Sequence, residues 1–346
     1  MTLKEIAKLA NVSQGTVDRV VHERGRVSPK TKEKILKILK EVNYKPNIYA
    51  RGLVLNKTYE IVALLPEFVE GEYWQLPTLG VLKGAKDLEQ FGVKLTILSF
   101  DQKNADSFLH QVNKVLAMKP DGVILAPVIN VEALKLTEKL AEINTKFTII
   151  DSNLDTNKSL SFVGQDAYQS GRLAASLMIP NLEQSKTILI ISIKSNENHN
   201  STLKKRIDGF YSYINESEDN IDLGRFNIDE RDKSWYNDLQ NLITASNATG
   251  IFVPSSKVHH VAKFLENADK KIHLIGYDLI AKNSFYLEKN VINYIIGQRP
   301  ENQGYIAMYN FYRALIAKEE VKNLHYLPID IISKENLMYY KDDILN

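Results

Sequence analysis

The segment VSQGTVDRVV, residues 12–21, places side chains that can read DNA bases beside a row of valines. Arg19 can form two hydrogen bonds with guanine, and Gln14 can do the same with adenine. Asp18 repels phosphate but can accept a hydrogen bond from cytosine N4. Ser13 is a good N-cap for a helix over residues 14–21 whose valines turn inward. The predicted DNA-facing set is Ser13, Gln14, Gly15, Thr16, Asp18 and Arg19.

A second set of polar and aromatic side chains follows apolar runs in the rest of the chain. Carboxylate, amide and guanidinium groups suit a polyhydroxylated ligand, because each hydroxyl can both donate and accept. A flat aromatic face can cover the apolar side of a sugar ring. The candidates are Glu67, Phe68, Tyr73, Trp74, Asp151, Asn153, Gln165, Asp166, residues 198–206, Ser255, Ser256, Asp278, Gln298 and Arg299.

Three short helices are predicted to carry the first set. Thr2 and Glu5 have capping-box spacing, which starts a helix at Leu3. Ser28 followed by Pro29 starts another, which runs to about Val42. With the helix over residues 14–21 between them, this is a helix-turn-helix pattern, whose second helix enters the DNA major groove. The alternative is a plain three-helix bundle with a mixed polar surface.

From Tyr59 onward, short apolar runs alternate with amphipathic stretches. Such alternation predicts parallel sheets covered on both faces, and its length predicts two lobes. Ligands bind at the carboxyl ends of such strands, in the cleft between the lobes. The predicted strands are 61–66, 94–100, 122–128, 147–151, 160–164, 187–193, 250–254, 272–278 and 291–297, and the helices include 81–91, 105–118 and 302–317.

The charge of the 346-residue chain is unevenly spread. Residues 1–58 hold 13 Lys/Arg and 5 Asp/Glu, a net charge of +8, while the remainder carries −6. A basic head on an acidic body indicates a polyanion-binding module joined to another part. Cysteine is absent, and no run approaches the roughly 18 apolar residues of a membrane helix. The charged start MTLKEIAKLA is unlike a secretory signal, so we expect a cytoplasmic protein without membrane contact.

Residues 2–53 resemble the DNA-binding headpiece of the lactose-repressor (LacI/GalR-type) family of transcription regulators. The matching elements are the TLKEIA opening, the ANVS turn, TVDR, VSPKT and NYKPNIYARGL. The resemblance implies that Gln14, Gly15 and Arg19 occupy base-reading positions. Two departures stand out: Asp18 replaces the usual serine, and Gly15 supplies no side chain for readout.

The resemblance also implies a hinge helix between head and body. It would span residues 46–55, contact DNA through Asn47, Tyr49 and Ala50, and wedge Leu53 into the minor groove. A segment this short, containing Gly52, is marginal as an isolated helix. We therefore expect it to fold on the operator; the alternative is an ordinary linker.

The body resembles the type I periplasmic-binding-protein fold, in its ribose-binding branch. The carrying segments are VGQDAYQSGRLAASLM, KKRIDGF, IGYD and IIGQRPENQG. The resemblance implies ligand contacts from Arg206 with its neighbour Lys204, and from Asp278, Gln298 and Asp151. Ser152 replaces the arginine and Ser255 the asparagine of the sugar binders, so the sugar stays open. The full predicted ligand set is Phe68, Trp74, Asp151, Lys204, Arg206, Ser255, Asp278 and Gln298.

Together these patterns predict an α/β protein with a small all-α headpiece and a two-lobed, doubly wound parallel-sheet body. The expected domains are a helix-turn-helix domain (1–45), a hinge (46–58) and a ligand-binding domain (59–346). Its N-lobe would comprise about 59–165 and 298–323, and its C-lobe about 166–297 and 324–346.

The predicted function is a ligand-responsive repressor of carbohydrate-utilisation genes. We expect a homodimer that binds palindromic operator DNA and takes a sugar-like effector in its cleft. The alternatives are a solute-binding protein and an α/β enzyme acting on a small polar metabolite. No phosphate loop, dinucleotide fingerprint or nucleophile elbow is found, so we expect no enzyme and no cofactor. The adjacent His259 and His260 cannot share a helix face, which argues against a metal site.

Overall fold

The computed structural model describes residues 3–21, 27–42, 57–182, 186–194, 201–217, 220–268 and 271–340. The chain divides into two compact units, Met1–Asn56 and Lys57–Asn346. We refer to them as the head and the body.

The head contains the three predicted helices: α1 (Leu3–Ala10), α2 (Gln14–Val21) and α3 (Pro29–Glu41). Ser13 Oγ accepts from the Thr16 N–H at 3.2 Å, and Ser28 Oγ accepts from the Thr31 N–H at 3.3 Å. These serines satisfy backbone donors that a helix start leaves without a partner. The three helices share one core of Ile6, Ala7, Ala10, Val17, Val20 and Ile35.

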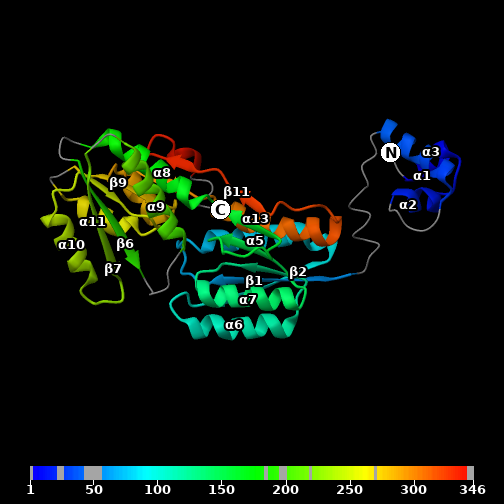
Figure 1. Ribbon diagram of the computed structural model, residues 1–346, viewed down its shortest axis with the longest axis horizontal. Helices are drawn as coiled ribbons and strands as arrows, with labels where there is room; N and C mark the ends of the chain where they lie inside the picture. The colour runs from blue at the N-terminus through cyan, green and yellow to red at the C-terminus, as the bar shows by residue number, and fades with distance from the viewer. Residues whose placement is uncertain are drawn as a thin grey trace. The chain divides into compact units, whose positions relative to one another are not determined.

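The body contains two six-stranded sheets, which we call the N-lobe and C-lobe sheets (Figure 1). The N-lobe sheet comprises β1 (Tyr59–Pro66), β2 (Val93–Phe100), β3 (Gly122–Leu125), β4 (Lys146–Asp151), β5 (Ser161–Gly164) and β11 (Leu324–Tyr326), in the order β11-β5-β4-β3-β1-β2. The C-lobe sheet comprises β6 (Thr187–Lys194), β7 (Asp222–Asp229), β8 (Gly250–Phe252), β9 (His273–Tyr277), β10 (Tyr294–Gly297) and β12 (Asp330–Ile332), in the order β12-β10-β9-β8-β6-β7. The two sheets have the same order of strands along the chain, but β11 is parallel to β5 whereas β12 is antiparallel to β10.

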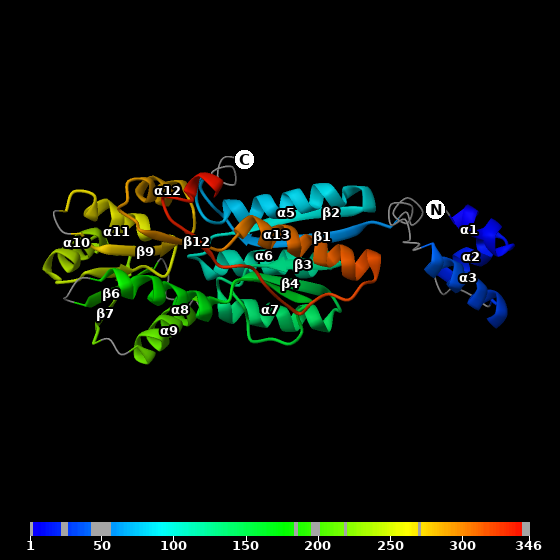
Figure 2. The same cartoon turned by 90° about the horizontal axis from the view of Figure 1, so that it is seen from above.

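Helices cover both faces of each sheet, as the nearly continuous apolar strands predict (Figure 2). On the N-lobe sheet, α6 (Ala105–Met118) and α7 (Asn130–Glu142) share a core with one face. The pair α5 (Gln75–Leu88) and α13 (Pro300–Phe311) covers the other. On the C-lobe sheet, α8 (Ala167–Met178) and α9 (Ser201–Glu216) lie opposite α10 (Trp235–Ala245), α11 (Val258–Leu265) and α12 (Ala281–Glu288). The predicted fold class is confirmed.

The chain passes from one lobe to the other after β5, after β10 and after β11. We expected the last passage near residue 323, but β11 still pairs with β5 in the N-lobe sheet, so the passage falls between Tyr326 and Asp330. The strands β7, β11 and β12 were not predicted from the sequence, because polar residues interrupt the apolar ones in β7, four of whose eight residues are exposed, and the other two strands have three residues each. No helix among the described residues is long and apolar enough to cross a bilayer.

Candidate functional site

A cleft of about 1560 Å³ in the body collects residues that follow strands of both sheets. In a parallel sheet, the carboxyl ends of neighbouring strands meet at one edge, so side chains distant in sequence converge there. The cleft is lined by all of the predicted ligand-binding residues: Phe68, Trp74, Asp151, Lys204, Arg206, Ser255, Asp278 and Gln298.

The C-lobe half of the cleft holds a buried chain of polar contacts. Arg206 Nη2 donates to Gln298 Oε1 at 2.5 Å, and Gln298 Nε2 donates to Asp278 Oδ1 at 2.7 Å. The guanidinium also donates to Pro254 O at 2.9 Å and lies 3.8 Å from the centre of the Tyr277 ring. The geometry therefore fixes a cation, an amide and a carboxylate in one row.

The position of Arg206 depends on a close helix contact. A Cβ on Gly171 of α8 would lie 1.9 Å from the Arg206 carbonyl oxygen on α9, so glycine alone allows this approach. The two backbones pack directly, which holds Arg206 at the edge of the cleft.

The N-lobe half of the cleft holds a different arrangement around Asp151. The Tyr73 hydroxyl donates to Asp151 Oδ1 at 2.6 Å, and Ser152 Oγ donates to Asp151 Oδ2 at 3.1 Å. Ser152 Oγ also lies 2.7 Å from Thr202 Oγ1 of the C-lobe. Ser152 stands where the sugar binders that the body resembles have an arginine. It binds Asp151 and also contacts Thr202 of the C-lobe.

Burial controls the charge of both acids. It raises the pKa of Asp278 to about 7, although the Arg206 guanidinium and the hydrogen bond from Gln298 lower it. Burial also raises the pKa of Asp151, against the hydrogen bond from Tyr73. A carboxylate poorly solvated by water gains from hydroxyl donors on a bound molecule. The site therefore favours a ligand rich in hydroxyl groups.

The remaining predicted residues differ in their exposure. Phe68 is 38% exposed and Lys204 is exposed, whereas Trp74 is only 7% exposed. Ser255 is half-buried and accepts from the Lys257 N–H at 3.4 Å. No group of three metal-ligating side chains with suitable geometry occurs in the part of the chain that is described.

The head presents most of the predicted DNA-facing set on its surface. Ser13, Gln14, Gly15 and Arg19 are exposed. Thr16 and Asp18 are half-buried, and Thr16 Oγ1 lies 2.8 Å from Ser13 Oγ in the helix cap. Arg19 Nε donates to the Gly15 carbonyl at 3.1 Å. The predicted hinge contacts Asn47, Tyr49, Ala50 and Leu53 lie outside the described residues.

Comparison with known proteins identifies both parts. Residues 62–319 match the periplasmic binding protein domain family, and residues 2–47 match the lacI family of bacterial regulatory proteins. The chain belongs to the periplasmic binding protein domain family and carries a lacI-type head. Catabolite control protein A of Priestia megaterium is 33% identical over 124 residues, a match that spans only 36% of this chain and 36% of that protein. The ribose operon repressor of Lactococcus lactis is 25% identical over 97% of this chain and 98% of that protein.

Solved structures share the fold of this lacI-type protein. A Bacteroides fragilis protein classed with the LacI transcriptional regulators has a TM-score of 0.76 and 27% identity, covering 82% of this chain and 100% of that one. A glucose-galactose binding protein from Geobacillus stearothermophilus has a TM-score of 0.70 at 23% identity, covering 82% and 99%, and supports the fold alone.

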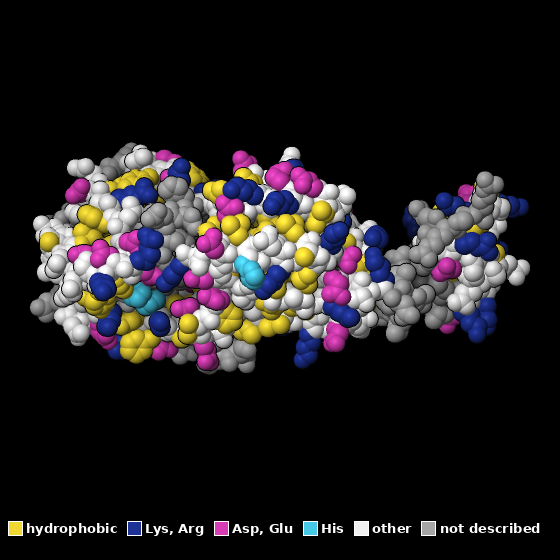
Figure 3. Space-filling view, turned by 90° about the horizontal axis from the view of Figure 1, so that it is seen from below, with side chains coloured by type: hydrophobic (Ala, Val, Ile, Leu, Met, Phe, Trp, Pro, Cys, Tyr) yellow, Lys and Arg dark blue, Asp and Glu magenta, His cyan; other side chains and the backbone are white. Residues whose placement is uncertain are grey.

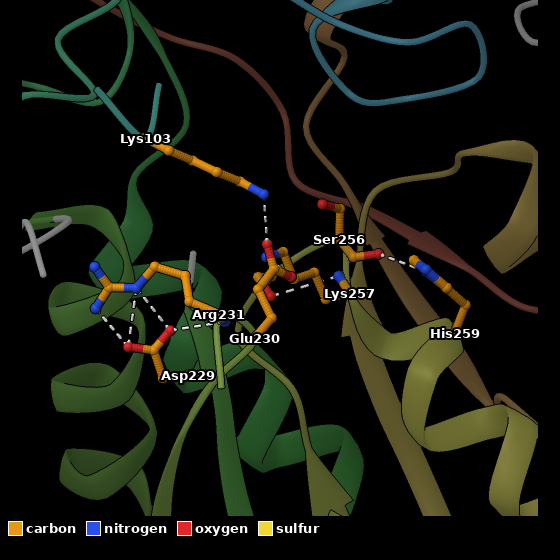
Figure 4. A network of polar contacts seen from close by, with 8 residues as sticks. Lys103, Asp229, Glu230, Arg231, Ser256, Lys257 and His259 are labelled. Carbon is orange, nitrogen blue, oxygen red and sulfur yellow. Dashed lines mark hydrogen bonds and ion pairs between the residues drawn. The ribbon is translucent and has the colours of Figure 1, made fainter. Parts of the chain in front are cut away.

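The periplasmic-binding-protein body of this lacI-type chain contains one feature of the cleft that was not predicted from the sequence. Lys103, after β2 of the N-lobe, lies 3.3 Å from the Glu230 carboxylate, after β7 of the C-lobe (Figure 4). Glu230 also pairs with Lys257, whose pKa burial lowers. The ion bridge therefore spans the cleft. Glu230 was not predicted because it follows β7, whose polar residues prevent the strand from standing out as an apolar run.

Proposed function

We propose that this protein is a transcriptional repressor of carbohydrate-utilisation genes that binds operator DNA through its head and a sugar in its cleft. One observation carries the proposal: a single chain joins an exposed recognition helix, α2, to a buried row of Arg206, Gln298 and Asp278. A free-standing solute-binding protein has no use for such a helix. We expect ligand binding without turnover, in the cytoplasm.

The head is the part suited to DNA. Residues 1–56 hold 12 Lys/Arg and 5 Asp/Glu, a net charge of +7, whereas acidic and basic side chains are interspersed over the face of the body in Figure 3. Arg19 and Gln14 have the donor patterns that read guanine and adenine. A Cβ on Gly15 would meet only Ser13 Oγ, at 4.0 Å, so packing within the head does not require glycine. Its absent side chain would let the helix approach the bases closely.

A two-fold dimer would place two such helices in successive major grooves of a palindromic site. Sugar binding would alter operator affinity only if the sugar binds the DNA-competent and DNA-incompetent states with different free energies. A cleft that both lobes complete is suited to this, because closing it moves one lobe against the other.

The sugar assignment rests on the buried Asp278 and the half-buried Asp151, two acids placed to accept from hydroxyls, and on Trp74 at the cleft wall. The full-length relative is named for ribose. D-ribose is therefore the first compound to test, followed by D-glucose and D-galactose, which also offer several hydroxyl groups to the two acids.

The experiment is selection of sequences from a randomised duplex pool, followed by fluorescence anisotropy on the enriched site. We expect a palindromic consensus, with a log–log salt slope that grows by about 0.9 for each neutralised phosphate. Arg19→Ala should relax base preference at one position of each half-site. No enriched sequence, or binding indifferent to salt, would refute the DNA-binding role.

A further inference from the structure

Gln303 is a fully buried amide in the first turn of α13 that sequence reasoning did not single out. A buried amide needs partners for its donors and its acceptor. Gln303 finds them in two different halves of the cleft, although its own side chain is not part of the cleft wall.

The acceptor side of Gln303 holds the backbone of Asp151. Gln303 Oε1 accepts from the Asp151 N–H at 2.9 Å. Asp151 has a φ of 67°, a left-handed conformation that a non-glycine residue keeps only when its surroundings impose it. Asp278 has the same φ in the C-lobe, but its N–H bonds to the Ile296 carbonyl at 3.1 Å. The backbone N–H of Asp151 is therefore bound by a side chain, whereas that of Asp278 is bound by a backbone carbonyl.

The donor side of Gln303 holds the backbone of Gln298. Gln303 Nε2 donates to the Gln298 carbonyl at 3.1 Å. The side chain of Gln298 in turn links Arg206 to Asp278. One amide therefore joins the N-lobe acid to the residue that orients the C-lobe pair.

The helix that carries Gln303 is fixed against its neighbour. A Cβ on Gly304 would lie 2.2 Å from the Pro77 carbonyl, and a Cβ on Gly80 would lie 1.9 Å from the Glu301 carbonyl. The backbones of α13 and α5 are thus in direct contact at the turn that contains Gln303. The backbone of Gln303 therefore cannot shift without moving both helices.

We propose that Gln303 is a positioning residue that sets Asp151 and Gln298 at the separation at which both halves of the cleft bind one ligand. It acts through these two residues and does not touch the ligand itself. The inference rests on the proposed function for the identity of the ligand, but not for the contacts that Gln303 makes.

Two substitutions and one control test the role. Gln303→Met removes both hydrogen bonds at similar volume. Gln303→Glu keeps both when the new carboxyl is protonated, because it then donates and accepts, and loses the donor when it ionises. Buried carboxyls can ionise as late as about pH 8–9, so a series from pH 6 to 9 spans the change. Asn310→Leu is the control, since Asn310 is a buried amide on the same helix whose Nδ2 has no hydrogen-bond partner among the described residues.

The first readout is single-residue hydrogen exchange at the Asp151 amide without sugar. We expect exchange about tenfold or more faster in Gln303→Met, and parent-like exchange in Asn310→Leu. The second is the calorimetric Kd for D-ribose, D-glucose and D-galactose, expressed relative to the parent at each pH so that titration of Asp151 and Asp278 cancels. We expect about a tenfold weaker Kd for Gln303→Met at every pH, and a ratio for Gln303→Glu that rises from near one as pH rises.

An Asp151 amide that exchanges as slowly in Gln303→Met as in the parent overturns the proposal, and so does a parent-like Kd in that variant. If the Kd of Gln303→Glu relative to the parent does not change with pH, Gln303 contributes only by packing, and this result also overturns the proposal. If none of the three sugars binds the parent, the proposed effector class fails, while the amide exchange still decides whether Gln303 holds Asp151.

Discussion

The two halves of the cleft share a backbone plan and differ in chemistry. Asp151 ends β4 and Asp278 follows β9, at equivalent places in two sheets of the same strand order, and both have a φ of 67°. Asp278 lies in a row with Gln298 and the cation Arg206, whereas Asp151 is bound by the neutral hydroxyls of Tyr73 and Ser152. The repeated fold thus fixes where an acid stands, and residues from other segments decide how its charge is compensated.

The largest expected effect is a loss of sugar binding that is greater when Asp278 is replaced than when Asp151 is replaced. Asp278→Ala leaves the buried Arg206 without its compensating carboxylate, and losing one partner of such a set costs about 2–5 kcal/mol of binding. We expect sugar binding and the sugar response to vanish, while ligand-free operator binding is retained. Asp151→Ala should cost less, because its partners are neutral. Calorimetry on both variants decides; equal losses would show that the compensation by Arg206 is irrelevant.

The second prediction concerns stability against pH. Because burial raises the pKa of Asp278 to about 7, the folded protein holds a proton that the unfolded chain, with an aspartate pKa near 4, releases. The unfolded state therefore gains stability relative to the folded state as pH rises from about 4 to 7, and the penalty persists above pH 7.

Asp278→Asn should remove this slope and raise the free energy of unfolding at pH 8 by at most about 4 kcal/mol. Urea titrations of parent and variant between pH 5 and 8 measure it. Parallel pH profiles for the two proteins would mean that the carboxyl is ionised in the folded state throughout this range.

A smaller effect is expected at the N-lobe acid. Tyr73→Phe removes the 2.6 Å hydrogen bond to Asp151 and should weaken sugar binding by about 1–2 kcal/mol. The matched control is Tyr305→Phe, which removes a tyrosine–aspartate bond of 3.0 Å to Asp87 at the exposed surface. The control should bind sugar as the parent does. If Tyr73→Phe binds sugar as tightly as the parent, Asp151 does not contribute to the sugar site.

The smallest effect is expected at the ion bridge across the cleft. Lys103 is half exposed, and such pairs contribute about 0–1 kcal/mol that salt screens. Lys103→Met should change the sugar Kd by less than about fivefold at low salt, and not at all near 1 M salt. Lys135→Met, which breaks a pair within one helix of the N-lobe, serves as the control. An effect that persists in high salt would assign Lys103 a direct ligand contact.

The sequence predicted the features that depend on continuous burial. Strands such as β1, with seven of its eight residues buried, stand out as apolar runs, and their carboxyl ends locate Asp151 and Asp278. The strand β7 has only one buried residue and mixes polar with apolar side chains, so Glu230 beyond it could not be assigned to the cleft. The contacts of Tyr73 with Asp151 and of Gln303 with Gln298 depend on loop and helix packing between segments, which no local pattern encodes.

The most direct test of the account is the operator affinity of the full chain with and without saturating sugar. With the selected duplex and each of D-ribose, D-glucose and D-galactose, fluorescence anisotropy should show that one sugar changes the operator Kd by about 5- to 150-fold. The change should be absent in Asp278→Ala, whose operator binding without sugar matches that of the parent. An operator Kd that none of these sugars alters, although calorimetry shows one of them bound in the cleft, would contradict a sugar-responsive regulator.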